Sequence, residues 1–309
     1  MEVFLNGLMA GVLYALVALG FVLIFKASGI FNFAQGVMAL FAAMTLVGIM
    51  EGQVPFSHLI NAIVPALFAI ILTVGVMVLL AMAVQKFVMG HLVNQEPIIL
   101  FMATIGLAYF LEGLSDLMWG SEIKKLDVGL PQGINETIDT VTYEIFGYGF
   151  FIDNLDIVAS VIAALLVIAL MLFSQYTKQG RALRAVADDH QAALSVGISL
   201  NFIWVLVWSL AGIVALVAGI MWGTKSGVQF SLSLIALKAL PVLMLGGFTS
   251  IPGAIVGGLI IGVGEKLFEF AIGPMVGGAT ENWFAYVLAL LFLLFRPQGL
   301  FGEKIIERV

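Results

Sequence analysis

Long apolar runs separated by short polar segments dominate the chain. They cover approximately residues 4–25, 33–50, 59–85, 97–119, 155–176, 200–223, 232–248, 252–272 and 282–295. About 20 helical residues cross a hydrocarbon core of about 30 Å, and lipid offers no partner for open backbone groups. The runs are too long and too continuously apolar for barrel strands. They therefore predict an all-α, polytopic transmembrane helix bundle.

The sequence leaves the number of spans open. The run at 232–248 is short and contains Lys238 and Pro241, so it could be re-entrant or broken instead of spanning. We expect about eight to ten spanning or re-entrant helices. The first run lacks a basic segment before it and continues past the length of a signal-peptide core, so we expect a retained span.

Lysine and arginine are distributed unevenly between the two sides of the membrane. If nine segments cross, one side carries Lys26, Lys86, Lys178, Arg181, Arg184, Arg296, Lys304 and Arg308. The other side carries Lys124, Lys125 and Lys225. The positive-inside rule then places the N-terminus outside and the C-terminus in the cytoplasm. Residues 120–154 become an acidic external loop and residues 177–200 a basic cytoplasmic loop.

Composition agrees with this interpretation. Of the 309 residues, 62% are hydrophobic and 10% are charged, whereas soluble domains carry roughly a quarter charged residues. A separate soluble domain has too few polar residues to cover it, so we expect residues 1–309 to form a single transmembrane domain. The chain has no cysteine, which excludes disulfides and thiolate ligands.

No enzyme motif is present. His58, His91 and His190 are far apart in the sequence, and no pair has metal-ligand spacing. The chain also lacks the G-x-x-x-x-G-K-[ST], G-x-S-x-G and H-E-x-x-H patterns. We predict no catalytic residues, no bound metal and no ATPase site in this chain. Any energy source must lie on another chain.

The basic loop, TKQGRALRAVADDHQAALSVGISLN, predicts a short Ala-rich amphipathic helix, with Asp189 as the N-cap of a second turn and Gly197 as its stop. Such a helix suits docking into a groove on a partner. A solvated basic loop that only fixes topology is the alternative. The candidate coupling residues are Gly180, Arg181, Arg184, Asp188, Ala192, Ala193 and Gly197.

The same loop resembles a known family. Gln191-Ala192-Ala193 with Gly197 looks like the EAA-x-x-x-G pattern of ABC importer permeases, with Gln in place of Glu. The segment from Gly180 to Ile198 is closely similar to the loop of the branched-chain amino acid permeases of the LivH type. Further motifs in the same order are Asn6-Gly7-Leu8, Asn32-Phe33-Ala34-Gln35-Gly36, Leu245-Gly246-Gly247, Ser250-Ile251-Pro252-Gly253-Ala254 and Arg296-Pro297-Gln298-Gly299-Leu300.

This resemblance implies a multi-pass permease subunit of a bacterial inner membrane. Its implied partners are a homologous second permease of the LivM type, two cytoplasmic ATPases that bind ATP and magnesium, and a periplasmic solute-binding protein; no nucleic acid is implied. The implied cargo is branched-chain or other neutral amino acids, with urea or short amides as the alternative within the family. Two functions of other classes remain open. One is an autonomous channel or ion-coupled transporter, with Lys238 and Glu265 as functional charges, and the other is a structural or receptor-like subunit.

Two small, polar or glycine-containing segments allow two interpretations each. Asn32, Phe33, Gln35 and Gly36 begin the second apolar run. They either cap and pack a helix start or line a polar pathway. Gly246 and Gly247 begin a segment that is either a tight turn with close helix packing or part of a gate.

Ionisable side chains inside apolar runs require partners or water. The candidates are Glu112, Asp116, Lys238, Glu265, Lys266 and Glu269. We expect local helix pairs for Glu265, Lys266 and Glu269, and Lys238 either snorkels or faces a cavity.

Four-residue glycine spacings predict close helix contacts, either within the chain or on a dimer face. They occur at Gly7/Gly11, Gly219/Gly223, Gly253/Gly257 and Gly258/Gly262.

Overall fold

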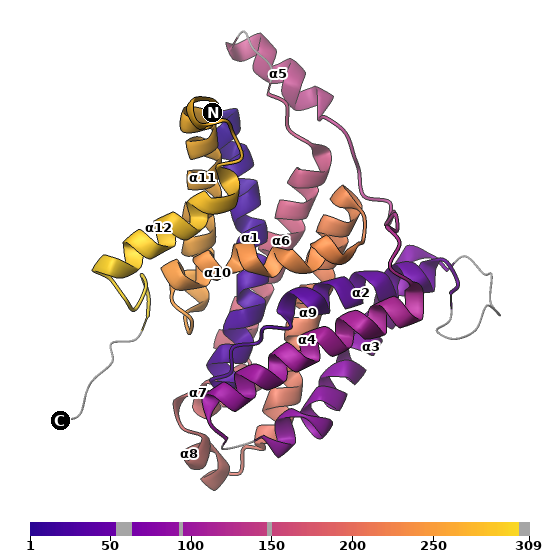
Figure 1. The fold of residues 1–309 in the computed structure, drawn as a ribbon, viewed down its shortest axis with the longest axis vertical. Coiled ribbons are helices and arrows are strands. Elements are labelled where there is room, and N and C mark those ends of the chain that lie inside the picture. Colours follow the sequence, from indigo (N-terminus) through magenta and orange to yellow (C-terminus); the bar gives the residue numbers. More distant parts are fainter. Residues whose placement is uncertain (54–63, 93–94, 147–149, 303–309) are drawn as a thin grey trace. The chain divides into compact units, whose positions relative to one another are not determined.

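A computed structural model describes residues 1–53, 64–92, 95–146 and 150–302, and within them every named element is a helix (Figure 1). The elements are α1 (Glu2–Ser28), α2 (Gln35–Met50), α3 (Ala66–Phe87), η1 (Met89–His91), α4 (Pro97–Trp119), α5 (Glu136–Phe146), α6 (Asn154–Tyr176), α7 (Lys178–Asp188), α8 (His190–Ser195), α9 (Leu200–Ser226), η2 (Phe230–Leu234), α10 (Ile235–Gly246), α11 (Ile251–Val276) and α12 (Glu281–Phe295). The all-α fold class is confirmed. His58, Lys304 and Arg308 lie outside the described residues.

The apolar helices correspond to the predicted runs. Five are long and apolar enough to cross a membrane: α1, α3 with η1, α4, α6 and α9. The segment from η2 through α10 passes the same test only together with α11, and the two are bent by 114° at the break between them, as expected for a broken span or a re-entrant loop. Helices α2 and α12 are shorter, at 16 and 15 residues. The chain is therefore a polytopic helical membrane protein with five or six candidate spans among the described residues, and its orientation stays a prediction. The expected eight to ten is too high, because α2 and α12 are short and the segment from η2 to α11 is broken.

Contacts divide the chain into two compact units, which we describe separately. One unit comprises residues 1–18, 130–167 and 238–309, and the other comprises residues 19–129 and 168–237. Helices α1, α6 and α10 each contribute to both.

In the second unit, α2 is buried along almost its whole length and packs against α3, α4, α9 and η2. Glycine makes these contacts close: a Cβ built on Gly219 of α9 would lie 2.6 Å from the Ala39 carbonyl oxygen of α2. A helix that is apolar all round is expected in such a position. Helix α2 is thus the centre of this unit.

In the first unit, glycine brings α1 against α11. A Cβ on Gly262 would lie 2.4 Å from the Cα of Gly11, and a Cβ on Gly7 would lie 2.7 Å from the Cα of Val263. Small residues allow helix backbones to approach this closely. The Gly7/Gly11 and Gly258/Gly262 spacings therefore serve contacts within the chain. Helix α12 packs on α11. The ring of Phe284 on α12 lies with its centroid 4.6 Å from that of Phe268 on α11.

The predicted external loop contains a helix that the sequence did not predict, α5. Glu136 and Asp139 stand in its first turn, where carboxylates interact favourably with the helix dipole. Before α5, the backbone of Lys124 exchanges two hydrogen bonds with Val228, at 3.0 and 2.8 Å, and its ammonium lies 2.9 Å from the Glu51 carboxylate. The described part of this loop is therefore held by specific contacts.

Candidate functional site

Helices α7 and α8 form a capped helical turn between α6 and α9. The Thr177 hydroxyl accepts a hydrogen bond from the Gly180 amide at 2.9 Å and begins α7. The Asp189 carboxylate accepts from the amides of Gln191 and Ala192, at 2.8 and 3.0 Å, and begins α8. Both follow the rule that side-chain oxygens satisfy the free amides of a helix N-terminus. The predicted N-cap at Asp189 is confirmed.

Gly197 ends α8 in a left-handed conformation, with φ of +84°. Its amide bonds to the Leu194 carbonyl at 3.0 Å, and the Ile198 amide bonds to the Ala193 carbonyl at 3.0 Å. These two bonds define a Schellman motif, in which glycine avoids the steric cost of positive φ. The predicted glycine stop is therefore confirmed.

Two of the predicted coupling residues fasten α7 to the C-terminal end of α6. The Arg184 guanidinium donates to the carbonyls of Ser174 and Gln175, where a cation is stabilised by the helix dipole. Gly180 is buried, and a Cβ there would lie 2.3 Å from the Phe173 carbonyl oxygen. Both residues therefore position the turn, and Arg184 is not a freely exposed charge.

The remaining predicted coupling residues differ in exposure. Arg181, Asp188 and Ala192 are exposed, whereas Ala193 is buried. Two exposed apolar residues of the turn were not among the candidates named from the sequence: Leu194 is 53% exposed and Val196 is 73% exposed. Isolated apolar residues in a polar loop were the available signal. The turn thus presents a mixed polar and apolar surface.

The polar residues at the start of α2 are buried and hydrogen-bonded. The Asn32 side chain accepts from the Ala34 amide at 3.1 Å and donates to the side-chain oxygen (Oε1) of Gln35 at 3.3 Å. The Gln35 amide group in turn donates to the Ala211 carbonyl of α9 at 3.2 Å, and a Cβ on Gly36 would lie 2.0 Å from the Ser233 carbonyl oxygen. This geometry favours the capping and packing interpretation for Asn32, Gln35 and Gly36.

Thr104 of α4 completes this bend. Its hydroxyl accepts from the Phe33 amide at 3.1 Å and lies 3.2 Å from the Phe31 carbonyl oxygen. The Phe33 side chain, by contrast, is 41% exposed. No signal in the sequence marked Thr104, because it lies 71 residues from Phe33.

In the other unit, Gly246 and Gly247 form the break between α10 and α11. Gly247 has φ of +103°, and a Cβ on Gly246 would lie 2.2 Å from the Gly253 carbonyl oxygen. The Leu300 amide bonds to the Leu245 carbonyl at 2.8 Å, so the segment after α12 closes over the turn. The tight-turn interpretation fits this geometry.

The ionisable residues of the same unit form long-range pairs, so the prediction of local helix pairs was wrong. Lys238 of α10 pairs with the buried Glu265 of α11 and donates to the Glu281 carbonyl at 2.7 Å. Lys266 pairs with the Glu281 carboxylate at 2.8 Å. Glu269 accepts from the amide and hydroxyl of Thr280. These contacts tie the start of α12 to α10 and α11.

Across the part of the chain that the structure describes, no group of three or more His, Asp or Glu residues lies close enough to hold a metal ion.

Comparisons with known proteins give consistent matches. The family model described as "Branched-chain amino acid transport system / permease component" matches residues 3–296. The chain is 32% identical over 316 residues to the high-affinity branched-chain amino acid transport system permease protein BraD of Pseudomonas aeruginosa, covering 98% of this chain and 96% of that protein. It is 29% identical over 310 residues to the corresponding LivH of Salmonella typhimurium (strain LT2), with the same coverage.

Among solved structures, PsaBC from Streptococcus pneumoniae in complex with Fab matches with a TM-score of 0.47 and 14% identity, covering 96% of this chain and 91% of that chain. That likeness is too low to carry an argument.

Proposed function

The chain belongs to the branched-chain amino acid transport system permease family, and we propose that it is the permease subunit of an ABC-type importer for branched-chain or other neutral amino acids. Similarity to LivH and BraD along almost the full length of each protein supports this assignment. The cargo crosses between the helices of the permease pair by alternating access.

The partners follow from the same proposal. A homologous second permease of the LivM type completes the transmembrane pathway, and two cytoplasmic ATPases bind ATP and magnesium and supply the energy. A periplasmic solute-binding protein delivers the cargo to the external face. The complex resides in the bacterial inner membrane, and this chain contributes transport and no ATPase site.

The observation that carries the proposal is the α7–α8 turn. Its two helices are individually capped, α7 is fastened to the end of α6 through Arg184, and both helices contact α9. A solvated topological loop has no need of such fixed geometry. Force applied to α8 would therefore reach the two long helices α6 and α9. A coupling element between an ATPase and a permease requires such a connection.

Within the turn, the roles divide by exposure. Gly180, Arg184, Ala193 and Gly197 set its shape. Arg181, Asp188 and Ala192, together with Leu194, form the surface that docks into a groove on the ATPase.

The pathway and gate assignments are a further part of the proposal. Asn32, Gln35 and Gly36 fix the start of α2, and the exposed Phe33 ring faces the pathway. Gly246 and Gly247 act as the hinge of the α10–α11 break. The hydrogen bonds of Asn32 and Gln35 support the first of these roles, and the close contacts of Gly246 and Gly247 place them at the break.

Co-purification from the native membrane tests the coupling role. Arg181→Glu combined with Leu194→Asp reverses one exposed charge and adds another on the docking surface. Lys125→Glu makes the same charge reversal at an exposed position on the predicted external loop and serves as the control. We expect the ATPase subunits to co-purify with the wild-type chain and the control. In the double variant, their recovery and leucine uptake fall at least about tenfold, because two docking contacts each cost at least about 1 kcal/mol.

Two outcomes would contradict the proposal. Equal ATPase recovery from the double variant and the control would show that the turn is not the docking site. Leucine or urea uptake by the purified chain in vesicles without ATPases would instead identify an autonomous channel or secondary transporter.

A further inference from the structure

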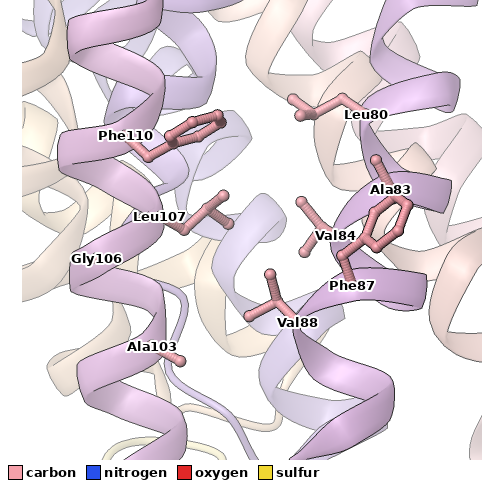
Figure 2. Close-up of a pocket in the computed structure, with 9 residues that line it drawn as sticks. All are labelled: Leu80, Ala83, Val84, Phe87, Val88, Ala103, Gly106, Leu107 and Phe110. Carbon is pink, nitrogen blue, oxygen red and sulfur yellow. The ribbon is translucent and has the colours of Figure 1, made fainter.

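An apolar groove of about 480 Å³ lies between α3 and α4 in the second unit. Figure 2 shows Leu107 and Phe110 of α4 pointing across the gap toward Leu80 and Val84 of α3 and toward Val88, which follows α3. The wall from Leu80 to Val88 is about 12 Å long at 1.5 Å per residue. That length is close to half of a hydrocarbon core of about 30 Å.

Small residues create the space. Ala83, Ala103 and Gly106 line the groove between the larger side chains, and a Cβ built on Gly106 would meet no other atom within 4 Å. A larger side chain at Gly106 would therefore enter the groove without displacing the protein. Gly113, two turns further along α4, also has free space around its Cβ position but does not line the groove.

A basic side chain, Lys86, lies beside the groove without lining it. The Lys86 ammonium lies 5.6 Å from the ring centroid of Phe87, which lines the groove. Lys86 is exposed and has no ion-pair partner among residues 1–53, 64–92, 95–146 and 150–302. An apolar slot with an unneutralised cation at the end of its helix fits an anionic amphiphile.

We propose that this groove binds one acyl chain of an anionic phospholipid, whose headgroup phosphate contacts Lys86. A helix of a second subunit fits less well, because the small residues that would let backbones meet are flanked here by two large rings. Here Phe87 and Phe110 are 70% and 62% exposed and would hold a second backbone away. A flexible acyl chain can pass between these rings and fill the space above Gly106.

Photo-labelling tests the site independently of the transport function. The complex purified from its native membrane is reconstituted with phosphatidylglycerol or phosphatidylcholine carrying a diazirine in the same acyl chain, and labelled peptides are mapped by mass spectrometry. We expect phosphatidylglycerol to label residues 80–88 and 103–110. Gly106→Phe should abolish that labelling and Gly113→Phe should leave it unchanged. Lys86→Gln should lower it about fivefold, the value of one lysine near an anionic lipid surface.

Three results would overturn the proposal. Labelling of these peptides could persist in Gly106→Phe, phosphatidylcholine could label them as strongly as phosphatidylglycerol, or the groove could crosslink to a helix of another subunit in place of lipid. Thermal unfolding of both glycine variants identifies a folding defect, and Lys86→Gln, which alters only an exposed side chain, keeps the headgroup assignment testable in that case.

Discussion

Replacing Lys238 by methionine tests whether the Lys238–Glu265 pair holds the first unit together. The Glu265 side chain is 1% exposed. One of its carboxylate oxygens bonds to Lys238. Lys238→Met therefore leaves a buried carboxylate without its cation and also removes the bond to the Glu281 carbonyl. Breaking one partner of a buried ion pair costs about 3–5 kcal/mol.

The neighbouring pair provides a matched control. Lys266 and Glu281 are also joined by one short ion pair, but their side chains are 33% and 32% exposed. A pair with both side chains about one-third exposed is screened by its surroundings, so Lys266→Met should cost clearly less than Lys238→Met. Lys238→Met should lower the apparent unfolding temperature by about 10 °C, taking about 2–4 °C per kcal/mol.

A double variant separates the ion pair from simple loss of packing. Lys238→Met with Glu265→Leu removes both charges and keeps apolar volume, and such replacements are often neutral. We expect it to recover most of the lost stability, giving a coupling energy of about 2–3 kcal/mol in a double-mutant cycle. Scanning fluorimetry in detergent measures the wild type, Lys238→Met, Glu265→Leu, the double variant and the Lys266→Met control. Equal costs for Lys238→Met and Lys266→Met, or a double variant no more stable than Lys238→Met, would show that the buried pair does not stabilise this unit.

Three further predictions use single substitutions, the first two measured by the same thermal unfolding and the third by amide hydrogen exchange. Gly262→Val forces α11 away from Gly11 and should cost at least about 1–3 kcal/mol; an unchanged unfolding temperature would contradict the close contact of the two helices. Thr104→Val is nearly isosteric but leaves the Phe33 amide unpaired, so it should cost about 1–3 kcal/mol, whereas Thr104→Ser should restore stability. Gly197→Ala must adopt positive φ and should cost about 1–2 kcal/mol locally, visible as faster amide exchange in α8, and equal exchange would argue against the motif.

Features set by local sequence were predictable. The nine apolar runs correspond to nine helices in the described residues, because lipid requires every apolar segment to satisfy its own backbone. Asp189 and Gly197 were identified as cap and stop from residue type and spacing, since both act within a few residues. Helix α5 was not predicted, because its acidic and weakly apolar sequence contains no long apolar run.

Features set by which helices meet were not predictable. The sequence suggested local partners for Glu265, but its partner is Lys238, 27 residues away. Spacing along one helix reveals i,i+4 neighbours only. Arg184 was chosen as a coupling residue for its charge, yet its guanidinium is engaged by the carbonyls at the end of α6. Charge alone could not distinguish a residue that docks from one that holds the docking element.

Helix α9 connects the candidate sites of the second unit. It contacts α7 and α8, and it packs along α2 and α3. Its Ala211 carbonyl accepts the Gln35 side chain, which in turn bonds to Asn32 at the bend before α2. A tilt of α9 imposed through α8 must therefore either carry the start of α2 with it or break the Gln35 bond, which is buried and costly to lose. Because packed helices move between discrete arrangements and do not deform continuously, movement of the α7–α8 turn would be transmitted to the buried helix at the centre of this unit.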